Sequence, residues 1–204
     1  MNISKAIMER RSIRKYENRE IPRELLNEIL EEAFWAPSGT NRQNWYVYVV
    51  RGEKRDLLIK AMGGLRELYK PKLEKVFPEK MVNLTLNFFQ TLGGAPVIIL
   101  VYIPLTGVEL RPDMTGQERY ENERERFVNL LSAAALVQNI LLLAKAKGLG
   151  TCQMTAPKYK EDLINEIIGV KDKELVSVIP VGYPAQDPPA PPRKGNRLHW
   201  LGFD

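Results

Sequence analysis

The chain has 204 residues, of which 44% are apolar and 27% charged, and this predicts one folded domain over residues 1–204 rather than a disordered chain. The net charge of +5 favours anionic partners, but basic residues are spread along the sequence without interleaved aromatic residues, so we expect no nucleic-acid interface. The single cysteine excludes an internal disulfide, and the single histidine argues against a metal site. Because the N-terminus has no apolar signal-peptide core, we expect a cytoplasmic protein.

The first predicted element is an amphipathic N-terminal helix that runs into a strongly basic turn. Ile3, Ala6 and Ile7 supply the apolar side of the helix, and the turn follows at residues 10–16. The turn offers planar guanidinium forks, which match phosphate and carboxylate oxygens, and a hydroxyl donor: Arg10, Arg11, Arg14 and Ser12. The cluster suits an anionic ligand rich in ring carbonyls and nitrogens. A solvated basic turn explains this stretch equally well when it is taken alone.

A second polar stretch lies between a predicted helix and a predicted strand. The helix starts at Pro22, where the missing N–H costs nothing, and ends before Pro37. Residues 45–51 are aromatic and β-branched, which is typical of a strand. The connecting residues 36–45 carry amides and hydroxyls suited to reading the edge of a heterocycle. Ordinary turns are made of the same residue types, and the stretch alone favours that interpretation.

The middle of the chain alternates regular elements with two charged, proline-containing segments. We predict helices over 56–62 and 81–92 and a buried strand over 96–103. Residues 65–80 are predicted to be mobile surface structure, and residues 104–123 an insertion. Both segments are candidates for a lid.

A long central helix is predicted from about Glu123 to Lys147, and Gly148 ends it. Its apolar run, residues 127–144, is close to the length of a membrane span but is interrupted by four polar residues, namely Asn129, Ser132, Gln138 and Asn139. The sequence therefore predicts a buried core helix and no membrane partner. The alanines at 133–135 indicate close approach by another element.

The last part of the chain contains a predicted strand near 150–155, a helix over 158–168 and a strand over 175–181. Residues 184–204 are rich in proline and are predicted to form an extended C-terminal arm. Helices and strands are interspersed along the chain, which indicates an α+β or α/β fold. The pattern alone leaves the pairing directions of the strands open.

The sequence lacks the side chains of most enzymes that catalyse without a cofactor. It has no Gly-x-Gly-x-x-Gly after a strand and no Walker lysine loop, and Gly148-Leu149-Gly150 is better explained as a helix end. His199 lies in the tail, and Cys152 lies in an apolar strand, where it is expected to be a small buried hydrophobe. We therefore expect no catalytic side chain and chemistry carried by a cofactor.

Four motifs in order resemble the nitroreductase superfamily. They are Arg-Arg-Ser-Ile-Arg-Lys-Tyr at 10–16, Ala-Pro-Ser-Gly-Thr-Asn-Arg-Gln-Asn-Trp at 36–45, Gly-Leu-Gly-Thr-Cys at 148–152, and Val-Gly-Tyr-Pro at 181–184 before the proline-rich tail. The resemblance covers nearly the whole chain. It implies an α+β fold with a central, mostly antiparallel sheet flanked by helices and a long buried central helix. It also implies a homodimer that binds FMN at the subunit interface.

The resemblance carries flavin contacts onto residues of this chain. The phosphate, ribityl chain and pyrimidine edge are assigned to Arg10, Arg11, Ser12 and Arg14, with Arg193 as a late basic residue on the phosphate. The loop that reaches the flavin from the other subunit is matched by Pro37, Ser38 and Gly39, with Asn41 nearby. A family asparagine at the pyrimidine is matched by Asn87, and the backbone near the central ring nitrogen by Gln153, Met154 and Thr155.

The implied activity is transfer of two electrons from NADH or NADPH to a flat aromatic acceptor, such as a nitroaromatic or a quinone, by a ping-pong mechanism. Arg14 at the pyrimidine end stabilises the negative charge that reduction leaves there. Two departures concern the acceptor. Gln90 stands where some members have a flavin-binding lysine, and residues 153–155 lack the acidic residue of bacterial nitroreductases and look closer to the dehalogenase-like branch.

Alternative functions remain at this point. A dehalogenase-like member requires a charged lid, for which Glu67, Tyr69 and Lys80 are candidates although their spacing matches poorly. A non-catalytic FMN-binding protein is the second alternative, and a basic nucleic-acid-binding module is the weakest. For the expected homodimer, the long apolar helix and the aromatic tail provide interface material, with Trp200, Leu201 and Phe203 in the tail. A tail folded back on its own subunit is the other interpretation.

Overall fold

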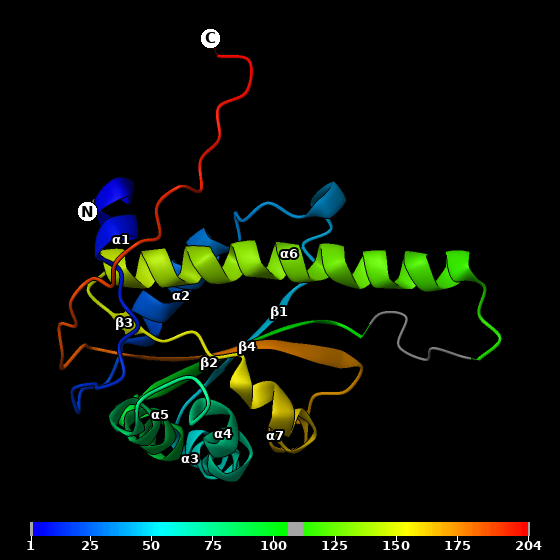
Figure 1. The fold of residues 1–204 in the computed structure, drawn as a ribbon. Helices are drawn as coiled ribbons and strands as arrows, with labels where there is room; N and C mark the ends of the chain where they lie inside the picture. Colours follow the sequence, from blue (N-terminus) through cyan, green and yellow to red (C-terminus); the bar gives the residue numbers. More distant parts are fainter. Residues whose placement is uncertain (1, 106–111, 204) are drawn as a thin grey trace.

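A four-stranded sheet forms the centre of the computed structural model, which describes residues 2–105 and 112–203 (Figure 1). Its strands are β1 (Tyr46–Val50), β2 (Val97–Pro104), β3 (Gly150–Thr151) and β4 (Lys173–Gly182). They lie in the order β1-β2-β4-β3, and each neighbouring pair is antiparallel. The antiparallel sheet flanked by helices confirms the α+β class, and the strand directions that the pattern left open are now assigned.

Two helices cover one face of the sheet, α2 (Arg23–Ala33) and the 31-residue α6 (Gly116–Ala146). Alternate residues of β2 point toward them, so that Val97, Ile99 and Val101 pack with the buried side of α6. By length and composition α6 could cross a membrane, but it lies flat on this face and supplies part of the core. The prediction of a long, buried central helix is confirmed.

Four helices cover the opposite face: α3 (Gly52–Gly63), α4 (Leu65–Leu73), α5 (Glu79–Thr91) and α7 (Glu161–Ile168). The other alternate residues of β2, Ile98, Leu100 and Tyr102, point into this second core. Because β2 is buried on both faces, its sequence is an unbroken apolar run rather than an alternating one.

The remaining described elements are α1 (Ile3–Glu9) and three 3₁₀ turns, η1 (Gly39–Asn41), η2 (Leu92–Gly94) and η3 (Ala156–Lys160). Residues 183–203 contain no helix or regular strand, and from 193 to 203 every residue is exposed. In Figure 1 this tail leaves the body on the side of α6 and extends past it.

Residues 65–80 contain a helix that was not predicted, and the central helix starts earlier than predicted. In residues 65–80, predicted to be mobile surface structure, helix α4 occupies Leu65–Leu73; Leu65 is fully buried, and Tyr69 packs edge-on against Phe89. The central helix begins at Gly116 rather than near Glu123, because a capping box starts it. The Thr115 Oγ1 accepts from the Glu118 N–H at 3.2 Å, and the Glu118 carboxylate accepts from the Thr115 N–H at 2.8 Å. Residues 106–111 of the predicted insertion lie outside the described residues.

Candidate functional site

The basic turn that follows α1 is fixed against the sheet. Ser12 forms a parallel bridge with Thr151, and the Ile13 N–H donates to the Thr151 carbonyl at 2.9 Å. The Tyr16 ring is buried, and its hydroxyl lies 2.7 Å from the Ile13 carbonyl oxygen and 3.1 Å from that of Pro180. Burial raises the pKa of this phenol far above its ordinary value, so Tyr16 stays neutral. Residues 10–16, called the basic arm from here on, therefore hold a defined path along β3.

Two glycines allow this close packing. A Cβ on Gly150 would lie 2.8 Å from the Ile13 side chain, and a Cβ on Gly93 would lie 2.1 Å from the Arg14 carbonyl oxygen. The Tyr16 N–H donates to the Gly93 carbonyl at 2.9 Å. The basic arm is thus held between β3 and the η2 turn at the end of α5.

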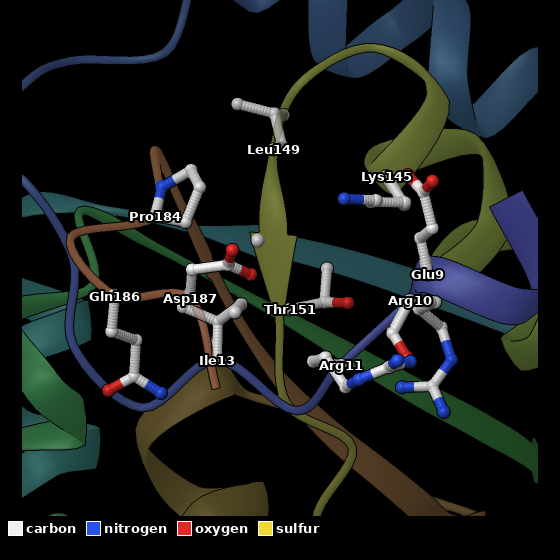
Figure 2. Close-up of a pocket in the computed structure, with 11 residues that line it drawn as sticks. Glu9, Arg10, Arg11, Ile13, Lys145, Leu149, Thr151, Pro184, Gln186 and Asp187 are labelled. Carbon is white, nitrogen blue, oxygen red and sulfur yellow. The ribbon is translucent and has the colours of Figure 1, made fainter. Parts of the chain in front are cut away.

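A cavity of about 370 Å³ opens beside the start of the basic arm (Figure 2). Figure 2 shows Arg10 and Arg11 at one end of this cavity, with Lys145 and Glu9 nearby and Thr151 of β3 in its centre. The opposite side is formed by the start of the tail, including Pro184, Gln186 and Asp187. Three cations and two carboxylates line the space, which leaves a positive balance.

The donors at this cavity fit a phosphate group. The Arg11 Nη1 donates to the carbonyl oxygens of Met8 at 2.7 Å and of Arg10 at 2.8 Å. Its Nε is buried and has no partner in the described part of the chain. An unpaired buried donor costs free energy, and an anion would remove that cost. Arginine forks beside a lysine are the donor set expected for a phosphate.

The other end of the basic arm meets α5. The Arg14 guanidinium lies 6.0 Å from the centroid of the Phe88 ring, at the outer limit of a cation–π contact. Asn87 precedes Phe88, and its side chain is exposed. The structure therefore brings Arg14 and Asn87 to the same end of α5, as the sequence-based assignment requires. Gln90, one turn further on, is also exposed.

The segment after β3 alternates between the core and the surface. Cys152 and Met154 are buried, and Gln153 and Thr155 are exposed between them. The Met154 N–H donates to the Val178 carbonyl at 2.9 Å, so this amide is already used by the sheet. Within the assigned segment, the amides left to approach a ligand are those of Gln153 and Thr155.

The thiol of Cys152 lies beneath the basic arm. Burial raises the pKa of Cys152, while Arg14, Arg10 and a hydrogen bond with Ser12 oppose the shift. The net direction is upward, which makes the thiol a poor nucleophile and agrees with the prediction of a small buried residue. The described residues contain no group of three His, Cys, Asp or Glu side chains that could hold a metal ion.

The loop at 37–41 lies elsewhere in the same chain. The Gly39 N–H donates to Ser132 Oγ at 3.3 Å, which places the loop over the middle of α6, whereas Lys145 lies at the cavity near the end of α6. Lys145 lies thirteen positions after Ser132 in α6, which is about 20 Å along the helix at about 1.5 Å per residue. One chain therefore does not bring Pro37, Ser38, Gly39 and Asn41 to the basic arm.

The residues that line the cavity differ from the sequence-based assignment at two positions. Arg193 is exposed on the tail and is not among the residues that line the cavity. Lys145, which does line it, was not identified from the sequence. A lysine in the last turn of a helix is common because it complements the helix dipole, so Lys145 carried no separate signal.

Comparison with known proteins gives the family. The sequence profile of the nitroreductase family matches residues 7–183. The chloronitrobenzene nitroreductase of Comamonas testosteroni is 26% identical over 197 residues, covering 85% of this chain and 82% of the relative. The iodotyrosine deiodinase of Hydra vulgaris is 27% identical over 199 residues, covering 93% and 68%. The crystal structure of the FMN and NADPH-dependent nitroreductase NfnB from Sphigopyxis sp. strain HMH superposes with a TM-score of 0.72 at 20% identity, covering 100% of both chains. The family profile, which spans most of the sequence, confirms the resemblance: this chain belongs to the nitroreductase family.

Proposed function

We propose that this protein is an FMN-dependent oxidoreductase that transfers two electrons from NADH or NADPH to a flat aromatic acceptor. The observation that carries the proposal is the basic arm, which places three arginines and Ser12 beside β3 and the end of α5. The family, the relatives named for nitroreductase activity and the neighbour named for FMN and NADPH support the same activity. Nitroaromatics and quinones are the proposed acceptors, and the cytoplasm is the proposed location.

In this proposal, one group of residues binds the phosphate of FMN and another group contacts its ring system. Arg10, Arg11 and Lys145 supply the phosphate end, where the buried Arg11 Nε has no partner among residues 2–105 and 112–203. Arg14 and Asn87 lie at the other end of the basic arm, where a fixed positive charge stabilises negative charge on the pyrimidine. The amides of Gln153 and Thr155 are the available donors for the central ring. FMN, when bound, supplies hydride acceptance from the nicotinamide and electron delivery to the acceptor, one partner after the other.

We further propose a homodimer in which each flavin contacts both chains. Since the loop at 37–41 stands about 20 Å along α6 from the cavity, a second copy is needed to bring it to the basic arm. The chain has apolar surface for such an interface. On α6, Phe127 and Leu131 are 59% and 55% exposed, and in the tail Trp200 and Leu201 are 67% and 86% exposed.

Reductive dehalogenation is the second candidate, because a deiodinase is as similar to this chain as a nitroreductase is. One observation weakens the charged-lid version of it. Tyr69 packs between Phe89 and Tyr159, each at 5.6 Å between ring centroids, and so is held in the body. Glu67 and Lys80 are exposed, but Tyr69, the third residue of the proposed lid, is not free to move with them. A non-catalytic FMN-binding protein is the remaining alternative.

Anaerobic half-reactions test the proposal. The purified protein, reconstituted with FMN, is mixed with NADH or NADPH, and the flavin absorbance is followed. It is then reoxidised with a nitroaromatic, a quinone or a halogenated tyrosine. We expect bleaching by at least one nicotinamide and fastest recovery with a nitroaromatic or quinone. Recovery only with the halogenated tyrosine would favour dehalogenation, and a protein that binds FMN without bleaching would be a binding protein.

A further inference from the structure

The loop between α2 and β1 has a strained backbone. Thr40, Asn41 and Gln43 have φ angles of 51°, 54° and 49°, in the left-handed region that non-glycine residues seldom adopt. Asparagine tolerates this conformation, but a β-branched threonine does not adopt it readily. Such backbone persists only where surrounding contacts impose it, and it gathers at functional sites. Residues 38–44 are called the strained loop below.

Three hydrogen bonds join residues of the strained loop to one another. The Asn41 N–H donates to the Ser38 carbonyl at 3.0 Å, the Gln43 N–H donates to Ser38 Oγ at 3.0 Å, and the Gln43 amide donates to Asn41 Oδ1 at 3.0 Å. These bonds define the shape of the strained loop. They do not fix where it stands relative to the sheet and α6.

A polar stripe on α6 supplies the external anchors. Glu125, Asn129 and Ser132 are spaced i, i+4 and i+7, so they lie on one side of the helix. Ser132 accepts from the Gly39 N–H at 3.3 Å, the Asn129 Oδ1 accepts from the Asn44 amide, and Glu125 pairs with Arg42. Gly39 lies so close to α6 that a Cβ there would be 2.5 Å from Val128 Cγ1.

Two of these anchors are buried polar residues of a core helix, and in the described part of the chain one of them, Asn129, carries an unpaired group. Asn129 is 1% exposed and Ser132 5% exposed, and the Asn129 Nδ2 is buried with no partner among the residues that the structure describes. An apolar side chain at 129 would avoid that unpaired donor. A need to hold the strained loop accounts for the asparagine, whereas stability of α6 does not.

We propose that Asn129 and Ser132 are positioning residues that fix the strained loop for a flavin bound mainly by a second copy of the chain. This inference rests on the proposed function, because that function assigns Pro37, Ser38 and Gly39 to the partner's flavin. Neither side chain touches the flavin. They act through the backbone of Gly39 and the side chain of Asn44, and so determine how firmly each subunit presents its loop to the other.

The first test compares affinity with stability. Asn129→Leu and Ser132→Ala are expected to weaken FMN binding about tenfold each, the usual effect of losing one hydrogen bond at a site. The melting temperature of the apoprotein should stay the same or rise for Asn129→Leu, since the unpaired donor is removed. Asn139→Leu is the control: Asn139 is another asparagine on α6, partly buried, but it donates to the Ala33 carbonyl at 3.3 Å instead of contacting the loop. A lower melting temperature with unchanged FMN affinity would overturn the proposal.

The second test asks whether the effect acts across subunits. Arg14→Ala damages the basic arm, and Asn129→Leu or Ser132→Ala damages the loop that is presented to the partner. When the two variants are mixed and exchanged, each heterodimer should contain one site with both halves intact, or about a quarter of all sites after random pairing. Recovery of wild-type FMN affinity in that fraction supports the proposal. No recovery, with dimers present by light scattering, shows that Asn129 acts only within its own chain.

These outcomes separate the inference from the function on which it rests. A protein that is monomeric and still binds FMN stoichiometrically would remove the shared site itself. A dimer that binds FMN normally with both Asn129→Leu and Ser132→Ala would leave the shared site intact and exclude the positioning role. If Asn129→Leu fails to fold, Ser132→Ala, which deletes one oxygen, decides the question.

Discussion

Arg11 illustrates how a charged side chain can be prepared for a ligand. Its Nη1 donates to the carbonyls of Met8 and Arg10, and this fixes the guanidinium plane. Its Nε is buried and has no partner in the part of the chain that the structure describes. Within the described residues, no acceptor competes with a ligand for this donor. Arg10, which also lines the cavity, is the neighbouring charge that an anion would meet.

Loss of single phosphate contacts should be measurable in flavin affinity. Arg10→Ala and Arg193→Ala are each expected to cost roughly 1.5–3 kcal/mol, or about ten- to a hundredfold in FMN affinity, with the fold retained. Equilibrium titration of the apoproteins measures this, with Arg197→Ala as the control on the tail. Because Arg193 is exposed on the tail, its effect requires the tail to reach a phosphate in the assembled protein. Unchanged affinity in both variants would remove the phosphate assignment.

The buried thiol of Cys152 should react slowly. Since burial raises its pKa, less thiolate is present at neutral pH than for a free cysteine, and access is also blocked. We expect labelling by a thiol reagent at pH 8 to be at least about tenfold slower in the native protein than after denaturation. Mass spectrometry of the labelled peptide gives the rate. Labelling of the native protein as fast as that of free cysteine would contradict the buried position.

At the scale of elements, one ion-pair network joins α6, β4 and η3. Glu174 is buried; Arg126 binds both of its carboxylate oxygens, at 2.8 and 2.6 Å, and Lys158 lies 3.1 Å away. These partners, Arg126 above all, hold the pKa of Glu174 below its usual value of 4.5 against the opposing effect of burial. The network ties the first half of α6 to the sheet and so supports the stripe at 125–132.

Removing Arg126 should destabilise the fold in a pH-dependent way. Arg126→Met leaves a buried carboxylate with only Lys158, and we expect a loss of about 2 kcal/mol at pH 7, less than for a completely broken buried pair. Because the pKa of Glu174 is lowered in the folded state, its stabilisation is present above pH 4.5 and disappears as the pH falls through the folded value. The difference in the free energy of unfolding between variant and wild type should therefore shrink as the pH falls below 4.5. Urea unfolding at pH 7 and pH 4 measures this difference. The control is Arg124→Met, because Arg124 is an exposed arginine of the same helix.

Most elements were predictable because their signals are local. The apolar run of β2 and Gly148 at the end of α6 were readable from the sequence alone. Helix α4 was missed because Pro71 and its many charges favour irregular structure, whereas burial of Leu65 and the ring contacts of Tyr69 come from distant segments. The start of α6 was missed although the Thr115–Glu118 capping box is a sequence signal.

The candidate site, like the fold, contains some residues that the sequence identified and others that only the packing of distant segments brings there. The motif residues Arg10–Arg14 could be assigned by resemblance, but Lys145 enters the cavity only through the packing of α1 against α6. Likewise, the sequence analysis interpreted Asn129 and Ser132 only as polar interruptions of an apolar helix. Their contacts with residues some ninety positions earlier in the chain could not be derived from local pattern.

At the scale of the whole molecule, flavin binding and dimerisation should be linked, because a site built from two chains cannot form in a monomer. We expect a homodimer by light scattering, and deletion of residues 196–204 should weaken both self-association and FMN retention. The reason is that the deletion removes the exposed apolar residues Leu198, Trp200, Leu201 and Phe203. A tail that packs on its own subunit instead predicts lower thermal stability with unchanged association.

The continuous helix α6 has a consequence for how such a dimer can evolve. The anchor for the loop and the lysine of the cavity lie on one continuous helix, so the number of residues between them sets the distance between the loop and the cavity within one chain. A single residue inserted between Ser132 and Lys145 would turn one end relative to the other by about 100° and move it by about 1.5 Å. In the proposed dimer, both shared sites would be misaligned by this single change. Surface loops can vary in length, but the stretch between Ser132 and Lys145 can change only by substitution.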